Sequence, residues 1–168
     1  LRDLDSDGSC DSYEVVSNAW EVGANFHEFS FGPIFNEGYF YVALAIAVEN
    51  GGATTNPQQK DRGTFIKIDP ETGQYEVLAA GLRTPNGVGI SPDAKTFYIA
   101  DNQGDYLPAN KIIAVKEGRF YGHRYHPAHP WSSKDVSPPM VWLPHNEIAN
   151  SPTEPVFFTK GIYAGQMI

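Results

Sequence analysis

The sequence predicts an all-β fold made of short antiparallel strands. The chain of 168 residues contains 16 glycines and 13 prolines, so few stretches are free of both. These residues leave room only for helices of about two or three turns. Hydrophobic residues make up 41% of the chain and aromatic residues 13%, which is enough for one core of ordinary size. Strands and turns around a single core are therefore the expected architecture.

Two stretches of the chain share one pattern, in which a strand, a turn and a second strand follow one another. Residues 31–33, Phe-Gly-Pro, precede the apolar strand 40–43, and residues 90–92, Ile-Ser-Pro, precede the apolar strand 97–100. The two prolines stand 59 positions apart (92 − 33), more than the roughly 40 to 50 residues of common propeller blades. The polar loop 49–62 accounts for the excess. The repeat predicts a β-propeller, and we expect this chain to stop before the propeller closes.

The strands between and after the repeats follow from the alternation of apolar and polar residues. Residues 64–68 and 74–78 alternate in this way on both sides of a turn rich in Asp, Pro and Gly, so they predict a β-hairpin. Residues 111–115 predict a later strand. We expect residues 1–168 to form one partial propeller domain.

Charge and cysteine content exclude several classes of function. The formal net charge is -8 and the twelve Lys and Arg residues are scattered, so no basic stripe exists to bind nucleic acid. Cys10 is the only cysteine, which excludes an internal disulfide or a CxxC zinc site within this chain. The longest apolar run, residues 39–48, is well short of the roughly 20 residues that span a bilayer. We expect no transmembrane segment in this chain.

Residues 3–14 fit the twelve-residue calcium-binding loop. Carboxylates stand at the positions that supply ligands, and Gly8 stands at the sixth position, where the loop turns sharply. The expected ligands are Asp3, Asp5, Asp7, Asp11 and Glu14, together with the Ser9 carbonyl. The segment 13–16, Tyr-Glu-Val-Val, is typical of a strand, so this would be a calcium loop within a β protein. A solvated acidic turn without metal is the alternative.

His27 is the first candidate for a catalytic base. Alternation places Phe29 and Phe31 on the same side of the chain as His27, and Glu28 on the other. A histidine at the entrance of an inner strand can act as a base, and a hydrogen-bonded structural histidine is the alternative.

Three further groups of polar residues stand at expected turns or loops. Arg83 precedes a proline-constrained turn that could direct its guanidinium toward a central funnel. Residues 101–105, Asp-Asn-Gln-Gly-Asp, follow an apolar strand, where propellers commonly build sites, although an ordinary Asp/Asn-rich turn has the same composition. His123, His126 and His129 are spaced by three, but the prolines between and after them oppose a helix. We expect loop histidines there.

Several motifs, taken in order along the chain, resemble one family of propellers. These are His27 with Phe31-Gly32-Pro33, then Gly63–Ile68, Gly81–Gly87, Asn102–Asp105 and Gly118–Gly122. Together they resemble the six-bladed propeller family of soluble quinoprotein glucose and sorbosone dehydrogenases, and within it the bacterial membrane-bound dehydrogenase-type propellers. The resemblance covers roughly residues 25–125.

The resemblance implies a dehydrogenase that oxidises a sugar or alcohol with pyrroloquinoline quinone and calcium. His27 would take the proton of the substrate hydroxyl. Arg83, Gln103, Gly104 and Asp105 would bind the cofactor, and the carbonyls of Gly104 and Asp105 would hold its calcium ion. The calcium loop and the quinone-type fold together indicate that this protein functions in the periplasm or outside the cell.

Two positions depart from the family's pattern. Phe26 replaces the acidic residue that usually precedes the base, and Thr84 replaces an asparagine after the arginine. A non-catalytic propeller that binds a carbohydrate or a protein is therefore the second interpretation, and a structural set of blades is the third. In each case the remaining blades, from the same chain or another, are expected partners.

Overall fold

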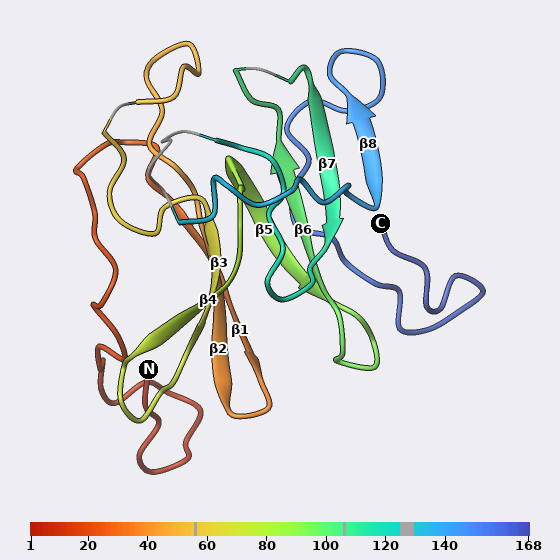
Figure 1. The fold of residues 1–168 in the computed structure, drawn as a ribbon. Helices are drawn as coiled ribbons and strands as arrows, with labels where there is room; N and C mark the ends of the chain where they lie inside the picture. Colours follow the sequence, from red (N-terminus) through yellow and green to blue (C-terminus); the bar gives the residue numbers. More distant parts are fainter. Residues whose placement is uncertain (56, 106, 125–129) are drawn as a thin grey trace.

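The computed structural model describes residues 1–55, 57–105, 107–124 and 130–168, and these residues form two four-stranded antiparallel sheets (Figure 1). The strands of the first sheet are β1 (Ser30–Asn36), β2 (Tyr39–Leu44), β3 (Thr64–Ile68) and β4 (Tyr75–Ala80). The strands of the second are β5 (Thr84–Ile90), β6 (Phe97–Asn102), β7 (Ala109–Ala114) and β8 (Val141–Pro144). No helix is found in the described residues, so the predicted all-β class is confirmed.

The two sheets repeat one topology. Each is a meander in which consecutive strands are neighbours, in the order β1-β2-β3-β4 and β5-β6-β7-β8. The predicted hairpin of residues 64–78 is confirmed as β3 and β4, joined by the expected turn. The two predicted repeats form the first hairpin of each sheet, and the polar loop 49–62 lies between β2 and β3. A four-stranded meander that repeats along the chain is the structure of propeller blades.

The core lies between the two sheets. β1 and β2 both contact β5, and the buried side chains in this layer come from both sheets. They are Tyr41, Ala43, Phe65, Ala79, Leu82, Val88, Ile99, Ile113 and Tyr121. The aromatic rings of Tyr41 and Phe97, one from each sheet, have centroids 4.3 Å apart. Burial of this apolar surface holds the sheets together face to face.

The connection between β7 and β8 covers the outer edge of the first sheet. Ala80 in β4 pairs in parallel with Phe120, through hydrogen bonds to the backbone of Arg119 and Tyr121. The end of the edge strand β4 therefore has hydrogen-bond partners on both sides, which reduces the number of open backbone groups there. The same contacts fix residues 118–123 beside the start of β5.

The last residues of the chain pass close to β5. A Cβ added at Gly89 would overlap the Pro155 carbonyl, and one at Gly87 would overlap Glu154, so glycine is required for this approach. Val156 and Ile168 then exchange backbone hydrogen bonds of 3.0 and 2.8 Å as part of a short antiparallel pair.

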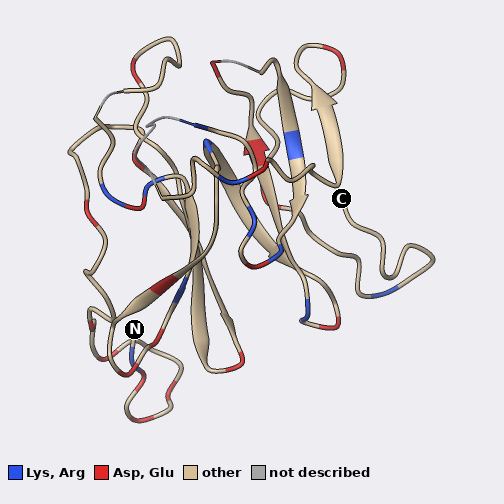
Figure 2. Ribbon diagram, in the orientation of Figure 1, with Lys and Arg blue, Asp and Glu red and all other residues tan. Residues whose placement is uncertain are grey.

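Three further observations concern the rest of the chain. The prediction of a strand at residues 13–16 is wrong, because this segment has no strand partner. No helix in the described residues is long and apolar enough to cross a membrane. Lys and Arg are scattered over the described residues and form no continuous stripe (Figure 2).

Candidate functional site

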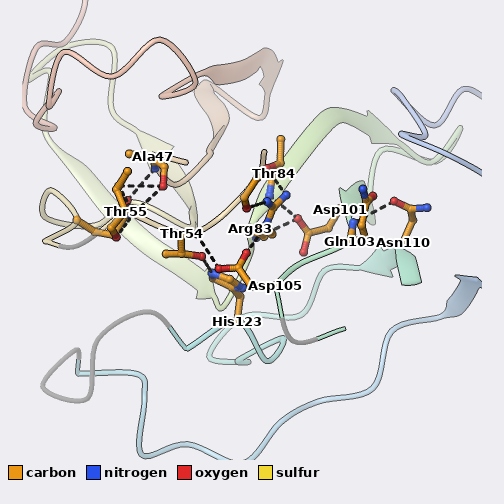
Figure 3. A network of polar contacts seen from close by, with 12 residues as sticks. Ala47, Thr54, Thr55, Arg83, Thr84, Asp101, Gln103, Asp105, Asn110 and His123 are labelled. Atoms are coloured by element: carbon orange, nitrogen blue, oxygen red, sulfur yellow. Dashed lines mark hydrogen bonds and ion pairs between the residues drawn. The ribbon is translucent and has the colours of Figure 1, made fainter. Parts of the chain in front are cut away.

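A network of polar side chains lies where the start of β5 meets the ends of β2 and β6 (Figure 3). Two backbone hydrogen bonds bring these ends together. Ala45, just after β2, donates to the Phe29 carbonyl over 3.0 Å, and Ile46 donates to the Arg83 carbonyl over 2.9 Å. The chain before β1, the end of β2 and the start of β5 therefore share one end of the two sheets.

Arg83 and Asp105 form the centre of this network. The Nε atom of Arg83 lies 3.5 Å from Oδ1 of Asp105, and its Nη2 atom donates a hydrogen bond to the Gly52 carbonyl. The other oxygen of Asp105 accepts a hydrogen bond of 2.7 Å from the Thr54 amide. Burial raises the pKa of Asp105, but the bonds from Thr54 and the charge of Arg83 outweigh it and hold the pKa below its usual range. Asp105 is therefore a carboxylate near neutral pH.

A buried ion pair lies beneath Arg83. Oδ2 of Asp101 is 2.9 Å from Nζ of Lys111, and the two side chains are 0% and 4% exposed. Oδ1 of Asp101 accepts hydrogen bonds from the backbone amides of Arg83 and Thr84, at 3.0 and 2.9 Å. Lys111 also donates to the Tyr121 carbonyl over 3.2 Å. This pair therefore fixes the backbone that carries Arg83 to the neighbouring strands β6 and β7.

His123 belongs to the network, although the sequence predicted only a loop histidine there. Its side chain is buried, and its Nε2 atom lies 3.3 Å from the Thr54 hydroxyl. Burial lowers the pKa of His123 from 6.5 to about 4, so the ring is neutral near neutral pH. The spacing of three histidines predicts loop histidines and gives no indication of this contact. His126 and His129 lie outside the described residues.

The loop after β6 contributes Gln103 and Gly104. The backbone amide of Gln103 donates a hydrogen bond of 3.0 Å to Oδ1 of the buried Asn110, and Gly104 exchanges backbone hydrogen bonds with Leu107. The Oε1 atom of Gln103 is buried and has no hydrogen-bond partner in the part of the chain that the structure describes. A buried oxygen without a donor is unfavourable unless a ligand or water supplies one.

His27 lies before β1, outside the network itself. Its ring packs against Phe26 and Phe29, with centroids 4.2 and 5.6 Å apart. Within the described residues no hydrogen bond or ion pair joins His27 to Arg83 or Asp105, and its Nδ1 atom is buried without a hydrogen-bond partner. Arg83 and Asp105 are therefore in direct contact, and His27 is not in contact with either. The Phe29 carbonyl, two residues after His27, accepts the Ala45 amide, and the next amide, that of Ile46, donates to the Arg83 carbonyl.

Arg62 supports the segment that carries His27. Its side chain is fully buried and donates to the carbonyls of Ala45 and Phe29, at 2.7 and 2.9 Å. These two bonds tie the chain just after His27 to the end of β2. Sequence reasoning did not single out Arg62, because it stands in the polar loop 49–62.

The acidic loop 3–14 lies elsewhere. Figure 1 shows it, in red, at the opposite end of the first sheet from the loop that carries Gly52 and Thr54. Carboxylate oxygens of Asp3, Asp5 and Asp11 lie within 4.8 Å of one another. Of the other predicted ligands, Glu14 pairs with Arg2 at 2.9 Å, and the Asp7 carboxylate accepts the Ser9 amide over 2.7 Å.

The chain is similar to proteins that act on sugars and their lactones. Residues 36–116 match the family model of the SMP-30/Gluconolactonase/LRE-like region. The lactonohydrolase oryH of Aspergillus oryzae (strain ATCC 42149 / RIB 40) is 39% identical over 75 residues, which make up 45% of this chain and 16% of that protein.

The crystal structure of the soluble aldose sugar dehydrogenase of Escherichia coli, in the apo-form, matches with a TM-score of 0.53 and 14% identity. The match covers 81% of this chain and 46% of the dehydrogenase, so the chain spans less than half the length of either relative. At this identity the likeness concerns the fold. The two repeated meanders and this match define a β-propeller fold.

Proposed function

We propose that the protein is a propeller enzyme that oxidises a sugar or alcohol with pyrroloquinoline quinone and calcium at the Arg83 site. The observation that carries the proposal is the ion pair of Arg83 and Asp105, which brings together side chains from two separate loops at one strand end. The family resemblance implies that both residues bind the cofactor. Strand ends around the axis are where propellers build their sites.

The residues of the site suit the groups that this cofactor presents. A guanidinium binds carboxylates through two parallel hydrogen bonds, which fits Arg83 to an acidic quinone. The buried Oε1 atom of Gln103 can accept a hydrogen bond from a ligand. The carbonyls of Gly104 and Asp105 are hard oxygen ligands of the type that calcium prefers. When bound, the quinone would supply a hydride acceptor and the calcium ion would supply a Lewis acid.

His27 is the proposed base. Its side chain is only partly buried, so the ring can be reached by a substrate hydroxyl and can accept its proton. Phe26 and Phe29 restrict the ring on two sides, which limits the directions from which a hydroxyl can approach. The remaining blades would supply the opposite wall of the funnel.

The loop 3–14 is proposed as a separate calcium site. The grouped carboxylates of Asp3, Asp5 and Asp11 support it, with Asp7, Glu14 and the Ser9 carbonyl as the further ligands. Glu14 would have to leave Arg2 to take part. Calcium binding and a quinone cofactor are consistent with the periplasm or the exterior of the cell, which we propose as the location.

Hydrolysis of a sugar lactone is a second candidate function. The 39% identity to a lactonohydrolase over 75 residues favours it, and so does the family model that matches residues 36–116. A lactonase opens the ring ester with water and needs no electron acceptor. A non-catalytic propeller that binds a carbohydrate or protein is the remaining alternative.

One experiment separates these candidates. The full-length protein is assayed for dye reduction with aldoses, with and without added quinone and calcium, and in parallel for hydrolysis of gluconolactone with divalent cations alone. We expect dye reduction that requires the quinone, and its loss in Arg83→Gln. Arg119→Gln, a cation away from the network, is the matched control. Lactone hydrolysis without dye reduction would favour the second candidate, and neither activity would favour the binding protein.

A further inference from the structure

The loop after β2 folds into a tight turn with a firmly held base. Ala47 accepts hydrogen bonds from the Thr55 amide at 3.2 Å and from the Gln58 side chain at 2.7 Å, and its own amide donates to Gln58 Oε1 over 2.8 Å. Above this base, the Glu49 amide donates to the Ala53 carbonyl over 2.7 Å. The base of the turn is therefore fixed to the first sheet.

The tip of the same turn crosses to the second sheet. The Gly52 carbonyl accepts a hydrogen bond from Arg83, and the Thr54 amide donates to Asp105 over 2.7 Å. The Thr54 hydroxyl also lies 3.3 Å from the ring of His123 (Figure 3). These contacts tie residues 49–55, here called the strap, to two side chains of the candidate site and to the histidine beside them.

The strap occupies positions that a ligand would need. A guanidinium pairs best with an anionic oxygen, but among the described residues the hydrogen-bond partner of Arg83 Nη2 is the neutral Gly52 carbonyl. Asp105 uses one carboxylate oxygen for Arg83 and the other for the Thr54 amide. The bond to Gly52 has a charge on the donor alone, whereas an oxyanion adds the attraction of an opposite charge and can therefore displace the carbonyl from Arg83. A ligand that binds only when the strap is displaced shifts the population toward the open form.

We propose that residues 49–55 are a strap that closes over Arg83 and Asp105, and that a ligand carrying an oxyanion opens it by replacing the Gly52 carbonyl on Arg83. The proposal rests on the site of the proposed function, but on neither of the two reactions considered for it. It predicts a closed resting state in which access to the site is controlled by a loop of the preceding blade.

Two adjacent glycines provide a matched pair of variants. Gly51 and Gly52 have nearly the same backbone angle, with φ of 92° and 93°. An added Cβ at Gly51 meets nothing within 4 Å, whereas one at Gly52 lies 3.2 Å from Nη2 of Arg83. Gly51→Ala therefore introduces backbone strain alone. Gly52→Ala introduces the same strain and also crowds the hydrogen bond between Arg83 Nη2 and the Gly52 carbonyl.

Hydrogen exchange of the strap amides in the full-length protein tests the closed state, with no substrate or quinone present. We expect Gly52→Ala to raise the exchange rate of the Thr54 amide at least about 5-fold above that of Gly51→Ala, since a hydrogen bond to a charged group is worth more than 1 kcal/mol. Asp105→Asn, which keeps the shape and removes the charge, should also raise it. Unchanged exchange of the amides in β2 and β6 would show that the strap opens locally and that the sheets are not destabilised. Equal exchange in the two glycine variants would overturn the proposal.

A second arm tests opening by an anion. Gluconate is titrated against the wild-type protein and the exchange of residues 49–55 is followed, with glucose as the neutral control. We expect gluconate to raise exchange in the strap, glucose to leave it unchanged, and Gly52→Ala to bind gluconate more tightly than Gly51→Ala. No response of the strap to gluconate would overturn the opening step. Because neither arm measures catalysis, both results stand whether or not the protein oxidises sugars.

Discussion

Substitution of Lys111 by Met tests how strongly the candidate site depends on the buried ion pair. The change removes the cation that lies 2.9 Å from Asp101 and leaves a carboxylate with a fully buried side chain. Breaking a buried pair from one side typically costs about 3 to 5 kcal/mol, because the remaining charge stays buried without a partner. Two backbone amides still donate to Asp101, so we expect a loss of about 3 kcal/mol in the free energy of unfolding, at the lower end of that range.

The chain offers a matched control on the neighbouring sheet. Lys67 pairs with Glu76 at 3.1 Å, but the two side chains are 26% and 60% exposed. An exposed pair contributes about 0 to 1 kcal/mol, so Lys67→Met should have little effect. Urea denaturation of the full-length protein gives both values. A double substitution, Lys111→Met with Asp101→Asn, should lose less than the sum of the two single changes. Equal small losses for the two lysines would refute the reasoning.

Three further predictions follow from other parts of the chain. His123 has a folded-state pKa of about 4 against 6.5 when unfolded, so the free energy of unfolding should fall by up to about 3 kcal/mol as the pH falls from 6.5 to 4. Urea denaturation at several pH values should show a smaller fall for His123→Gln, and the same fall as in the wild type would contradict this. Gly89→Ala should destabilise the protein by about 2 kcal/mol because its Cβ would overlap Pro155; wild-type stability would show that residues 152–157 do not pack on β5. Calorimetric titration should detect calcium binding to the wild type. Asp5→Asn should remove this binding, and Asp93→Asn, a change in an exposed turn, should preserve it. Loss of binding in both variants, or in neither, would contradict the site at residues 3–14.

The parts of the fold that depend on local sequence could be predicted. The hairpin of β3 and β4 follows from the alternation on both sides of a short turn, and the two repeats became the first hairpins of the two sheets. The strand predicted at residues 13–16 was wrong because its Val and Tyr residues favour a strand, but no neighbouring strand pairs with it.

The candidate site was predictable only in part. Arg83 and the loop 103–105 carry recognisable motifs, and their contact follows from the ends of β5 and β6 being neighbours. Thr54 and His123 carry no such signal. Thr54 reaches Asp105 across 51 positions of sequence and His123 across 69, so their roles depend on how two blades pack. Periodicity within one strand contains no information on such contacts.

Binding of the quinone to Arg83 is the central claim, and a titration measures it most directly. Pyrroloquinoline quinone is titrated into the full-length protein in the presence of calcium, and the dissociation constant is determined for the wild type, Arg83→Gln and Arg119→Gln. The account predicts saturable binding that Arg83→Gln weakens by at least about 10-fold, as expected for the loss of a charge-assisted contact, while Arg119→Gln leaves it unchanged. Absence of saturable binding, or equal affinity in the two arginine variants, would contradict it.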